Sequence, residues 1–134
     1  MKNIFKTFTL LLFIIAISSC SLDRSNPLDP YGYEDITVPA MVQGILLSST
    51  GGVVNIRWNR AEYVSKYRIY RSQSFDGKYE LIEEVSNPSA EAGNYVNTID
   101  SNVTLMRYYY KLSAVNVQGL EGPRSAYKYI LVRP

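Results

Sequence analysis

Beyond residue 39 the chain consists of short runs in which apolar and polar residues alternate, and turn-forming residues close each run. Such runs, spaced about ten residues apart, are typical of antiparallel sandwiches and barrels. The apolar positions repeat with the period of a strand, so no helix is needed to account for them. The pattern predicts seven strands, at residues 40–47, 53–58, 66–72, 79–85, 95–99, 107–116 and 126–132.

Alternation within each strand also predicts which side chains face the core, because successive residues of a strand point to opposite faces of its sheet. On the second and third strands the expected inward-facing side chains are Val54, Ile56, Trp58, Tyr67 and Ile69. Arg68 and Tyr70 then face outward. Trp58, the largest of the inward side chains, is expected to lie between two sheets that each bury one face.

The first twenty residues have the arrangement of a secretory signal. Lys2 and Lys6 precede an uncharged run at residues 7–17, and two serines follow that run. The run is shorter than the roughly 20 apolar residues that a membrane-spanning helix needs. We therefore expect residues 1–19 to be a signal peptide that is removed.

The sequence Ile17-Ser18-Ser19-Cys20 resembles the bacterial lipobox. The resemblance implies that Cys20, the sole cysteine of the sequence, becomes the lipid-modified first residue of the mature protein. It also implies a membrane partner, because two or more acyl chains on Cys20 anchor a protein stably. Ser21 stands where aspartate would retain an enteric lipoprotein at the inner membrane, so the implied location is the cell envelope, at the bacterial outer membrane. The alternative is an ordinary signal peptide with an incidental cysteine.

Residues 20–38 are expected to form the lipidated cysteine and a flexible tether, since they show neither helical nor strand periodicity. Asn26 and Asp29 each precede a proline, which keeps them out of the helical region. The acidic side chains of this segment suggest a calcium site, but they lack the alternating spacing and central glycine of a calcium loop. These residues are Asp23, Asp29, Glu34 and Asp35. Residues 39–134 then form one domain.

The composition excludes several kinds of site. The 134 residues contain no histidine and one cysteine, which excludes histidine general bases, zinc sites of the usual ligand sets and intrachain disulfides. The formal net charge is +2, but loss of Lys2 and Lys6 leaves twelve basic and twelve acidic residues. A neutral mature chain gives no electrostatic reason to expect nucleic acid as a partner. We expect no metal and no cofactor, because Gly51-Gly52 fits a hairpin turn and no glycine loop fits phosphate.

The residues that catalysis needs are also missing from the expected strands. Glu83 and Glu84 are adjacent carboxylates, but on a strand they point to opposite faces and cannot flank one substrate bond. Ser113 near Lys111 has no catalytic signature around it, and the same holds for Ser65 beside Lys66. We therefore expect that the protein is not an enzyme.

Three segments resemble parts of the fibronectin type III domain, over roughly residues 39–132. Residues 55–58 look like its second strand with the core tryptophan, residues 67–72 like its third strand, and residues 108–116 with Gly119 like its sixth strand and exit turn. The resemblance implies an all-β, seven-stranded antiparallel immunoglobulin-like sandwich. It implies that Tyr108 forms a tyrosine corner, with its hydroxyl bonded to the backbone of the preceding connection. It also places Tyr110, Leu112 and Ala114 in the core.

In this family the third, sixth and seventh strands share a sheet, which implies a candidate binding patch on the outer face of that sheet. Its residues are Arg68, Tyr70, Arg107, Tyr109 and Lys111. Tyrosine and arginine are enriched where proteins bind partners, and tyrosine rings also stack on sugars. The alternative is a patch without a ligand, in which tyrosines stabilise the sheet and cations keep it soluble.

These observations predict a lipid-anchored envelope protein whose single domain is a non-catalytic binding module. Its partner would be an envelope protein, an extracellular protein or a glycan. The alternative is a structural spacer or small subunit of an outer-membrane or cell-envelope assembly, in which edge strands make the contacts.

Overall fold

The computed structural model describes residues 37–134. Residues 1–36, which include the expected signal peptide, Cys20 and nearly all of the expected tether, lie outside the described residues. The elements are β1 (Leu46–Thr50), β2 (Val53–Asn59), β3 (Lys66–Ser72), β4 (Glu80–Ser86), the short 3-10 helix η1 (Ala90–Ala92), β5 (Tyr95–Asp100), β6 (Arg107–Val115) and β7 (Lys128–Leu131).

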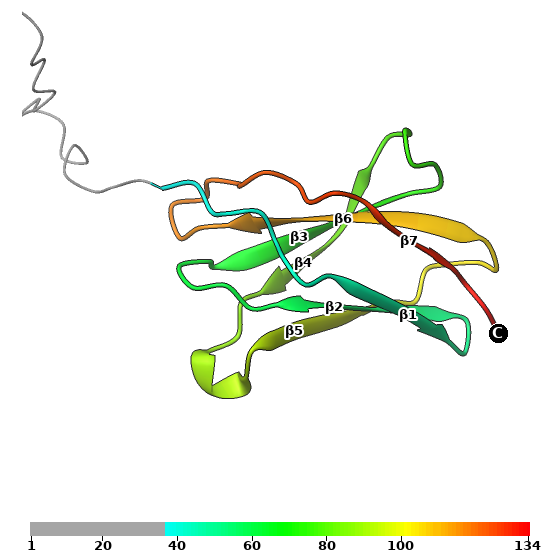
Figure 1. The fold of residues 1–134 in the computed structure, drawn as a ribbon, viewed down its shortest axis with the longest axis horizontal. Coiled ribbons are helices and arrows are strands. Elements are labelled where there is room, and N and C mark those ends of the chain that lie inside the picture. Colours follow the sequence, from blue (N-terminus) through cyan, green and yellow to red (C-terminus); the bar gives the residue numbers. More distant parts are fainter. Residues whose placement is uncertain (1–36) are drawn as a thin grey trace, which may run out of the picture. The chain divides into compact units, whose positions relative to one another are not determined.

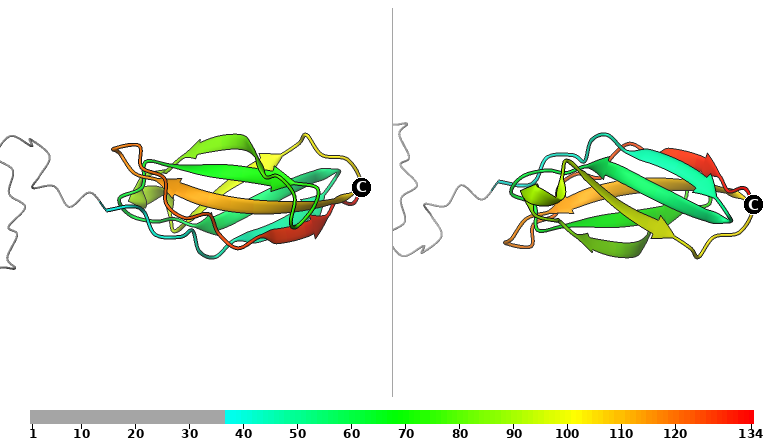
Figure 2. Two further views of the ribbon diagram at one scale, coloured as in Figure 1. Left: turned by 90° about the horizontal axis from the view of Figure 1, so that it is seen from above. Right: turned by 90° about the horizontal axis from the view of Figure 1, so that it is seen from below.

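The strands form two antiparallel sheets that pack as separate layers (Figure 1). One sheet has the order β1-β2-β5, and the other has the order β4-β3-β6-β7. Figure 2 shows the four-stranded sheet from above and the three-stranded sheet from below. The predicted all-β sandwich of seven antiparallel strands is thus confirmed.

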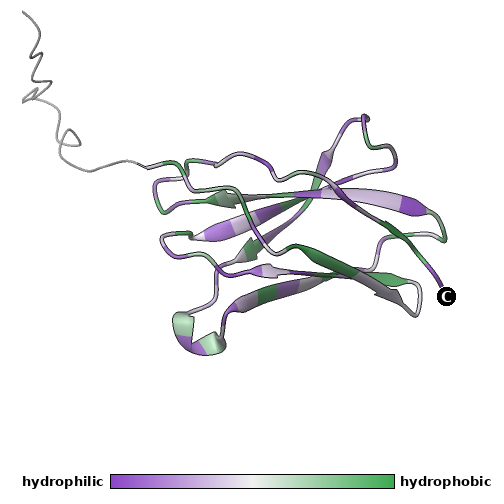
Figure 3. Cartoon of the chain, viewed as in Figure 1, coloured by the Kyte–Doolittle hydropathy of each residue, from purple (hydrophilic) through white to green (hydrophobic). Residues whose placement is uncertain are grey.

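The core lies between the facing sides of the two sheets. All nine side chains expected there are buried, namely Val54, Ile56, Trp58, Tyr67, Ile69, Tyr108, Tyr110, Leu112 and Ala114. Trp58 meets the ring of Tyr67 edge to face, with 5.2 Å between ring centroids, a favoured aromatic geometry. Figure 3 shows hydrophobic and hydrophilic positions interspersed along the strands, as a sheet with one buried face requires.

The first strand lies further along the chain than the sequence predicts. The prediction was residues 40–47, whereas β1 begins at Leu46 and continues to Thr50. The polar residues at its end are held in the ladder by a tight hairpin at Gly51 and Gly52, whose φ angles of 63° and 76° are those of a type I′ turn. Val42 and Ile45, from the expected strand, are still buried.

A tyrosine corner closes the connection between β5 and β6. The backbone N–H of Thr104 donates to the hydroxyl of Tyr108 over 3.1 Å. This is the role that the resemblance implies for Tyr108. The bond is made although the connection carries Thr104-Leu105-Met106 instead of the common proline-glycine pair.

The carboxylate of Asp100, at the end of β5, is the main buried polar centre of the described domain. It accepts hydrogen bonds from Nη1 of Arg71 at 2.8 and 3.0 Å, from the hydroxyl of Tyr110 at 2.9 Å and from the backbone N–H of Asn102 at 3.1 Å. Burial, followed by the charge of Asp100, raises the pKa of the Tyr110 hydroxyl. The tyrosine therefore stays a neutral donor to the carboxylate.

The start of the described chain is fastened to the loop between β6 and β7. The side-chain amide of Asn116 donates to the carbonyl oxygen of Thr37 over 3.1 Å. Gly122 packs so closely on this segment that a Cβ in its place would lie 2.2 Å from the carbonyl oxygen of Pro39. The chain therefore enters the sandwich at the end where β6 finishes (Figure 1).

Candidate functional site

The residues of the candidate binding patch do share the outer face of the four-stranded sheet. Tyr70 of β3 stands opposite Lys111 of β6 in the ladder. Arg107, Tyr109 and Lys111 alternate along β6 with residues that point into the core. The structure nevertheless divides the patch into two parts with different surroundings.

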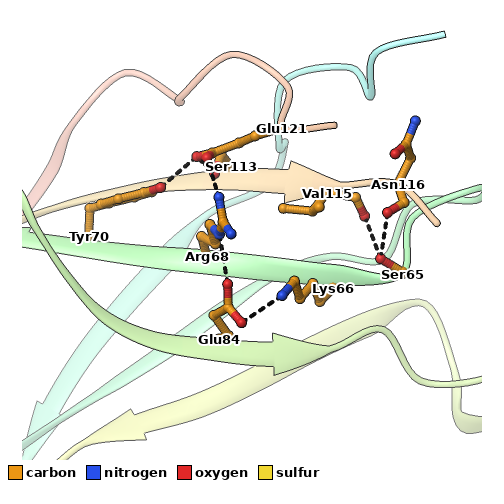
Figure 4. A network of polar contacts seen from close by, with 9 residues as sticks. All are labelled: Ser65, Lys66, Arg68, Tyr70, Glu84, Ser113, Val115, Asn116 and Glu121. Carbon is orange, nitrogen blue, oxygen red and sulfur yellow. Dashed lines mark hydrogen bonds and ion pairs between the residues drawn. The ribbon is translucent and has the colours of Figure 1, made fainter. Parts of the chain in front are cut away.

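Arg68 belongs to a polar network and carries little free charge. Its Nε donates to Glu84 over 2.7 Å, and its Nη1 donates to Glu121 over 2.6 Å (Figure 4). Lys66 forms a further ion pair with Glu84 at 2.7 Å. Hydrogen bonds from Arg68 to Glu84 and then to Glu121 raise the pKa of the Arg68 guanidinium. Both of its charge partners are thus supplied from within the domain.

Tyr70 lies on the outer face but is buried, with 5% of its surface exposed. Its hydroxyl donates to Glu121 over 2.5 Å, and the guanidinium of Arg124 lies 3.7 Å above its ring. Glu121 and Arg124 belong to the segment between β6 and β7, and this segment covers Tyr70. The alternation in β3 predicts the face of Tyr70 correctly, but it does not reveal this cover.

Glu121 holds the network together. Its carboxylate accepts hydrogen bonds from Ser113, Tyr70 and Arg68 at 2.5 to 2.6 Å (Figure 4). Burial alone acts to raise the pKa of this carboxyl, but the three hydrogen bonds outweigh burial and lower the pKa to about 2. The ionised form therefore fixes the β6–β7 segment to the sheet.

This pKa shift makes stability depend on pH. Because the carboxyl of Glu121 has a lower pKa in the folded chain than in the unfolded one, its contribution is complete above about pH 4.5 and is lost as the pH falls toward about 2. We expect Glu121→Gln to lower the free energy of unfolding by about 1 to 3 kcal/mol at neutral pH, and to lose less further stability on acidification than the wild type. Urea unfolding across this pH range measures both effects. The exposed Glu62→Gln is the control, and identical pH profiles for wild type and Glu121→Gln would contradict the assignment.

The second part of the patch is a cluster of aromatic side chains, which we call the aromatic face. Its members are Phe75, Tyr79, Tyr109, Tyr127 and Tyr129. Tyr109 stands opposite Tyr129 in the ladder between β6 and β7, with 5.9 Å between ring centroids. Tyr127 lies 5.7 Å from Tyr109, and Phe75, on the turn between β3 and β4, lies 6.1 Å from Tyr127.

The aromatic face is open to solvent. The exposed fractions are 56% for Phe75, 44% for Tyr127 and 61% for Tyr129. Large aromatic side chains bury extensive apolar area when they meet a partner. A cluster of this kind, left uncovered, is a typical binding surface.

Three cations flank the aromatic face and the adjoining Tyr70. Arg107 lies 5.4 Å from the ring centroid of Tyr129, and Lys111 lies 4.4 Å from that of Tyr79. Arg124 covers Tyr70. Within residues 37–134, none of the three is within 4.0 Å of a carboxylate oxygen. The ring faces attract and position these cations but do not neutralise their charge.

Arg107, Tyr109 and Lys111 belong to the patch predicted from sequence, whereas the side chains that surround them do not. Tyr127 and Tyr129 alternate along the chain, as Arg107, Tyr109 and Lys111 do, so each set could be assigned to one face from sequence. The register that puts Tyr129 opposite Tyr109 is not encoded in that alternation. Phe75 reaches the cluster from a turn, where no periodicity applies.

Outside the patch, the described domain has few features typical of a binding or metal site. A shallow hollow of about 520 Å³ is lined by the segment before β1, by β2 and β5, and by the start of β7. It contains one exposed aromatic ring, Tyr95, with Arg57 stacked 4.7 Å from its centroid. In residues 37–134 no three histidine, cysteine, aspartate or glutamate side chains gather as metal ligands do. Over the same range, no helix has the length and apolar character to cross a membrane.

The two sheets, their strand order and the tyrosine corner define an immunoglobulin-like sandwich, and solved structures show that it is a fibronectin type III-like domain. An Fn3-like protein from Clostridium thermocellum matches with a TM-score of 0.59 and 29% identity, over 73% of this chain and 97% of that one. The FN1–FN3 domains of chicken CNTN1 match with a TM-score of 0.56 and 17% identity, over 73% of this chain and 31% of theirs. The second likeness shows the fold alone.

Two curated proteins are also similar in sequence. An amylopullulanase from Thermoanaerobacterium saccharolyticum is 33% identical over 95 residues, which are 69% of this chain and 7% of that enzyme. An amylopullulanase from Thermoanaerobacterium thermosulfurigenes is 32% identical over 91 residues, which are 66% of this chain and 4% of that enzyme. The chain therefore spans less than a tenth of the length of these relatives. No family model matches the sequence.

Proposed function

We propose that this protein is a lipid-anchored bacterial envelope lipoprotein whose fibronectin type III-like domain is a non-catalytic binding module for a protein or a glycan. The observation that carries the proposal is the aromatic face. It exposes three large rings, and Arg107 and Lys111 lie beside it without a carboxylate partner in the described domain. Exposed aromatic and arginine side chains of this kind supply most of the energy in many interfaces.

The arrangement of the adjacent carboxylates supports a non-catalytic role. Glu84 is paired with Arg68 and Lys66. Glu83 accepts a hydrogen bond from the hydroxyl of Thr98 over 2.8 Å. The two carboxylates thus have separate structural partners and do not act on one bond. The small share of each amylopullulanase that matches also fits a module outside a catalytic centre.

The anchor is tested on the native product. We expect intact-mass measurement and tandem mass spectrometry of the membrane-extracted protein to find residues 1–19 absent and acyl chains on Cys20. Cys20→Ser should release the protein from the membrane fraction, because the acyl chains supply its stable attachment. A native product that retains Met1, or that carries an unmodified Cys20, contradicts the anchor but leaves the binding proposal standing.

The binding role is tested by crosslinking in intact cells, with captured proteins identified by mass spectrometry and captured glycans by sugar analysis. We expect Tyr109→Ser combined with Tyr129→Ser to reduce capture at least about tenfold, since the minority of interface residues that cost over about 1 kcal/mol each when truncated is enriched in tyrosine. Tyr95→Ser is the matched control, because Tyr95 is an exposed tyrosine stacked with arginine on the other sheet. Unchanged capture by the double variant, with its thermal melt preserved, removes the aromatic face as the binding site.

A structural role is the second candidate function, and β5 is the observation that favours it. This strand is an edge of the three-stranded sheet, and it exposes Tyr95 and Ile99. Edge strands can pair with a strand of another protein. Co-purification from membranes at a fixed stoichiometry that survives the change of Tyr109 and Tyr129 would favour a spacer or small subunit of an envelope assembly.

A further inference from the structure

We infer that the ligand of the aromatic face is an acidic polysaccharide, a chain of sugars that carry carboxylate groups. This inference rests on the binding role proposed above and names the chemistry of the partner. It follows from three features of the outer face of the four-stranded sheet: the distribution of charge, the open rings and the spacing of the cations.

The charges on this face are unequally balanced. Glu84 and Glu121, the carboxylates near Tyr70, are both engaged by Arg68. On the turn between β3 and β4, the carboxylate of Asp76 accepts from the hydroxyl of Ser74, and Glu80 lies 3.7 Å from Lys78. Glu80, Glu84 and Glu121 therefore already have cationic partners within the domain, whereas the partner of Asp76 is a neutral hydroxyl.

The three flanking cations differ from these acids, because no carboxylate among the described residues pairs with them. Arg107, Lys111 and Arg124 lie over tyrosine rings instead. A cation on a ring keeps its full charge and is held in one place. The face therefore presents fixed positive charge toward solvent, which complements an anionic ligand.

The open rings add a preference for a ligand that also has apolar faces. No cation lies over Phe75, Tyr109 or Tyr127 within the described domain. Phe75 and Tyr127 are about half exposed. The C–H face of a sugar ring can stack on such rings while its hydroxyl and carboxylate groups remain in water or meet the cations. A small inorganic anion would use the cations and leave the rings uncovered.

The spacing of the cations favours a polymer over a single charged sugar. Arg107 and Lys111 are four residues apart on β6, which places them roughly 13 Å from each other along the strand. Tyr109 lies between them on the same face. One monosaccharide cannot reach both Arg107 and Lys111. A polysaccharide with a carboxylate on each sugar unit can contact both cations and lie across the ring of Tyr109 between them.

The same features do not suit insertion into a membrane. A surface that inserts into a membrane buries its apolar face about 5 to 10 Å into the boundary between headgroups and acyl chains. Here Tyr109 is enclosed by Phe75, Tyr127 and Tyr129, with centroid distances of 5.7 to 6.4 Å, on the side of a sheet. These rings pack against one another and offer a broad surface instead of a wedge.

The test uses the soluble chain from residue 21 to 134, which contains the whole of the sandwich and its core. Affinity electrophoresis and calorimetry compare polygalacturonate with free galacturonate, with the uncharged glucan pullulan and with vesicles of phosphatidylglycerol and phosphatidylcholine. We expect binding to polygalacturonate that weakens as salt is added, and much weaker binding to pullulan, to the vesicles and to free galacturonate.

Charge variants connect this binding to the aromatic face. Arg107→Gln and Lys111→Gln should each weaken binding to polygalacturonate about tenfold, the effect of losing one charged contact. Arg57→Gln is the matched control, since Arg57 is also stacked on a tyrosine but lies on the other sheet. Equal loss with Arg57→Gln would show that attraction is non-specific and would overturn the inference.

The outcomes separate this inference from the proposed function. Equal or tighter binding to pullulan, or binding to vesicles alone, overturns the acidic polysaccharide and leaves a binding module with a different ligand. Absence of binding to every probe also overturns the inference. If capture in cells still depends on Tyr109 and Tyr129, the proposed function survives that result; if it does not, both fail.

Discussion

Replacement of Trp58 with alanine is expected to lower the free energy of unfolding by about 3 to 5 kcal/mol. Trp58 is fully buried between the sheets and packs edge to face on Tyr67. The change leaves a large cavity between the two sheets, because neither sheet can move far enough to fill the space of the lost side chain. A domain of this size has a total stability of roughly 5 to 15 kcal/mol, so the variant is expected to be partly unfolded at physiological temperature.

Urea unfolding of the soluble chain, followed by tyrosine fluorescence and circular dichroism, measures this loss. Val117→Ala is the control, because Val117 is exposed in the segment between β6 and β7 and surface changes usually alter stability by less than about 0.5 kcal/mol. A cost below about 1 kcal/mol for Trp58→Ala would be incompatible with a core between the two sheets.

Asp100→Ala is expected to lower the free energy of unfolding by about 3 kcal/mol, the second large effect. The change removes the acceptor of the buried Tyr110 hydroxyl and the charge partner of Arg71. Both donors then remain in the domain without their partner. Asp100→Asn should cost less than half as much, because an amide oxygen still accepts from Tyr110.

A double-mutant cycle with Tyr110→Phe separates this explanation from simple loss of volume. In the Tyr110→Phe background no hydroxyl is left unsatisfied, so Asp100→Ala should cost at least about 0.5 kcal/mol less than in the wild type. Strict additivity of the two changes would show that Asp100 does not act as the acceptor for Tyr110. Urea unfolding of the four proteins provides the measurement.

Strand positions and the core were largely predictable from sequence, because one buried face per sheet imposes a period of two. Alternation puts Trp58 in the core for this reason, and the resemblance to fibronectin type III domains puts Tyr110 there; both side chains are buried. The first strand begins and ends later than predicted, because its serines and threonine are residue types typical of a turn. In the structure Ser48 and Ser49 stay in the ladder, because backbone bonds, which do not depend on side-chain polarity, extend to the hairpin at Gly51-Gly52.

The candidate site was predictable only in part, for a different physical reason. The resemblance to fibronectin type III domains implies that Tyr109 and Lys111 lie on one outer face, and the ladder agrees. The sequence pattern does not indicate which loop covers the outer face of the four-stranded sheet. Tyr70 became buried because Arg124 lies over its ring, and Phe75 joined the aromatic face from a turn. Contacts between a loop and a sheet depend on register and loop path, which a single sequence does not fix.

The attachment of Thr37 to Asn116 determines how far a partner on the aromatic face stands from the end at which the chain enters the domain. Thr37 is bonded at the finish of β6, whereas Tyr109 lies seven residues earlier on the same strand, roughly 23 Å away along its direction. This separation belongs to the sandwich itself and does not depend on the length of the segment before Thr37. A bulky partner on the aromatic face would therefore stay clear of the point at which the chain enters the domain.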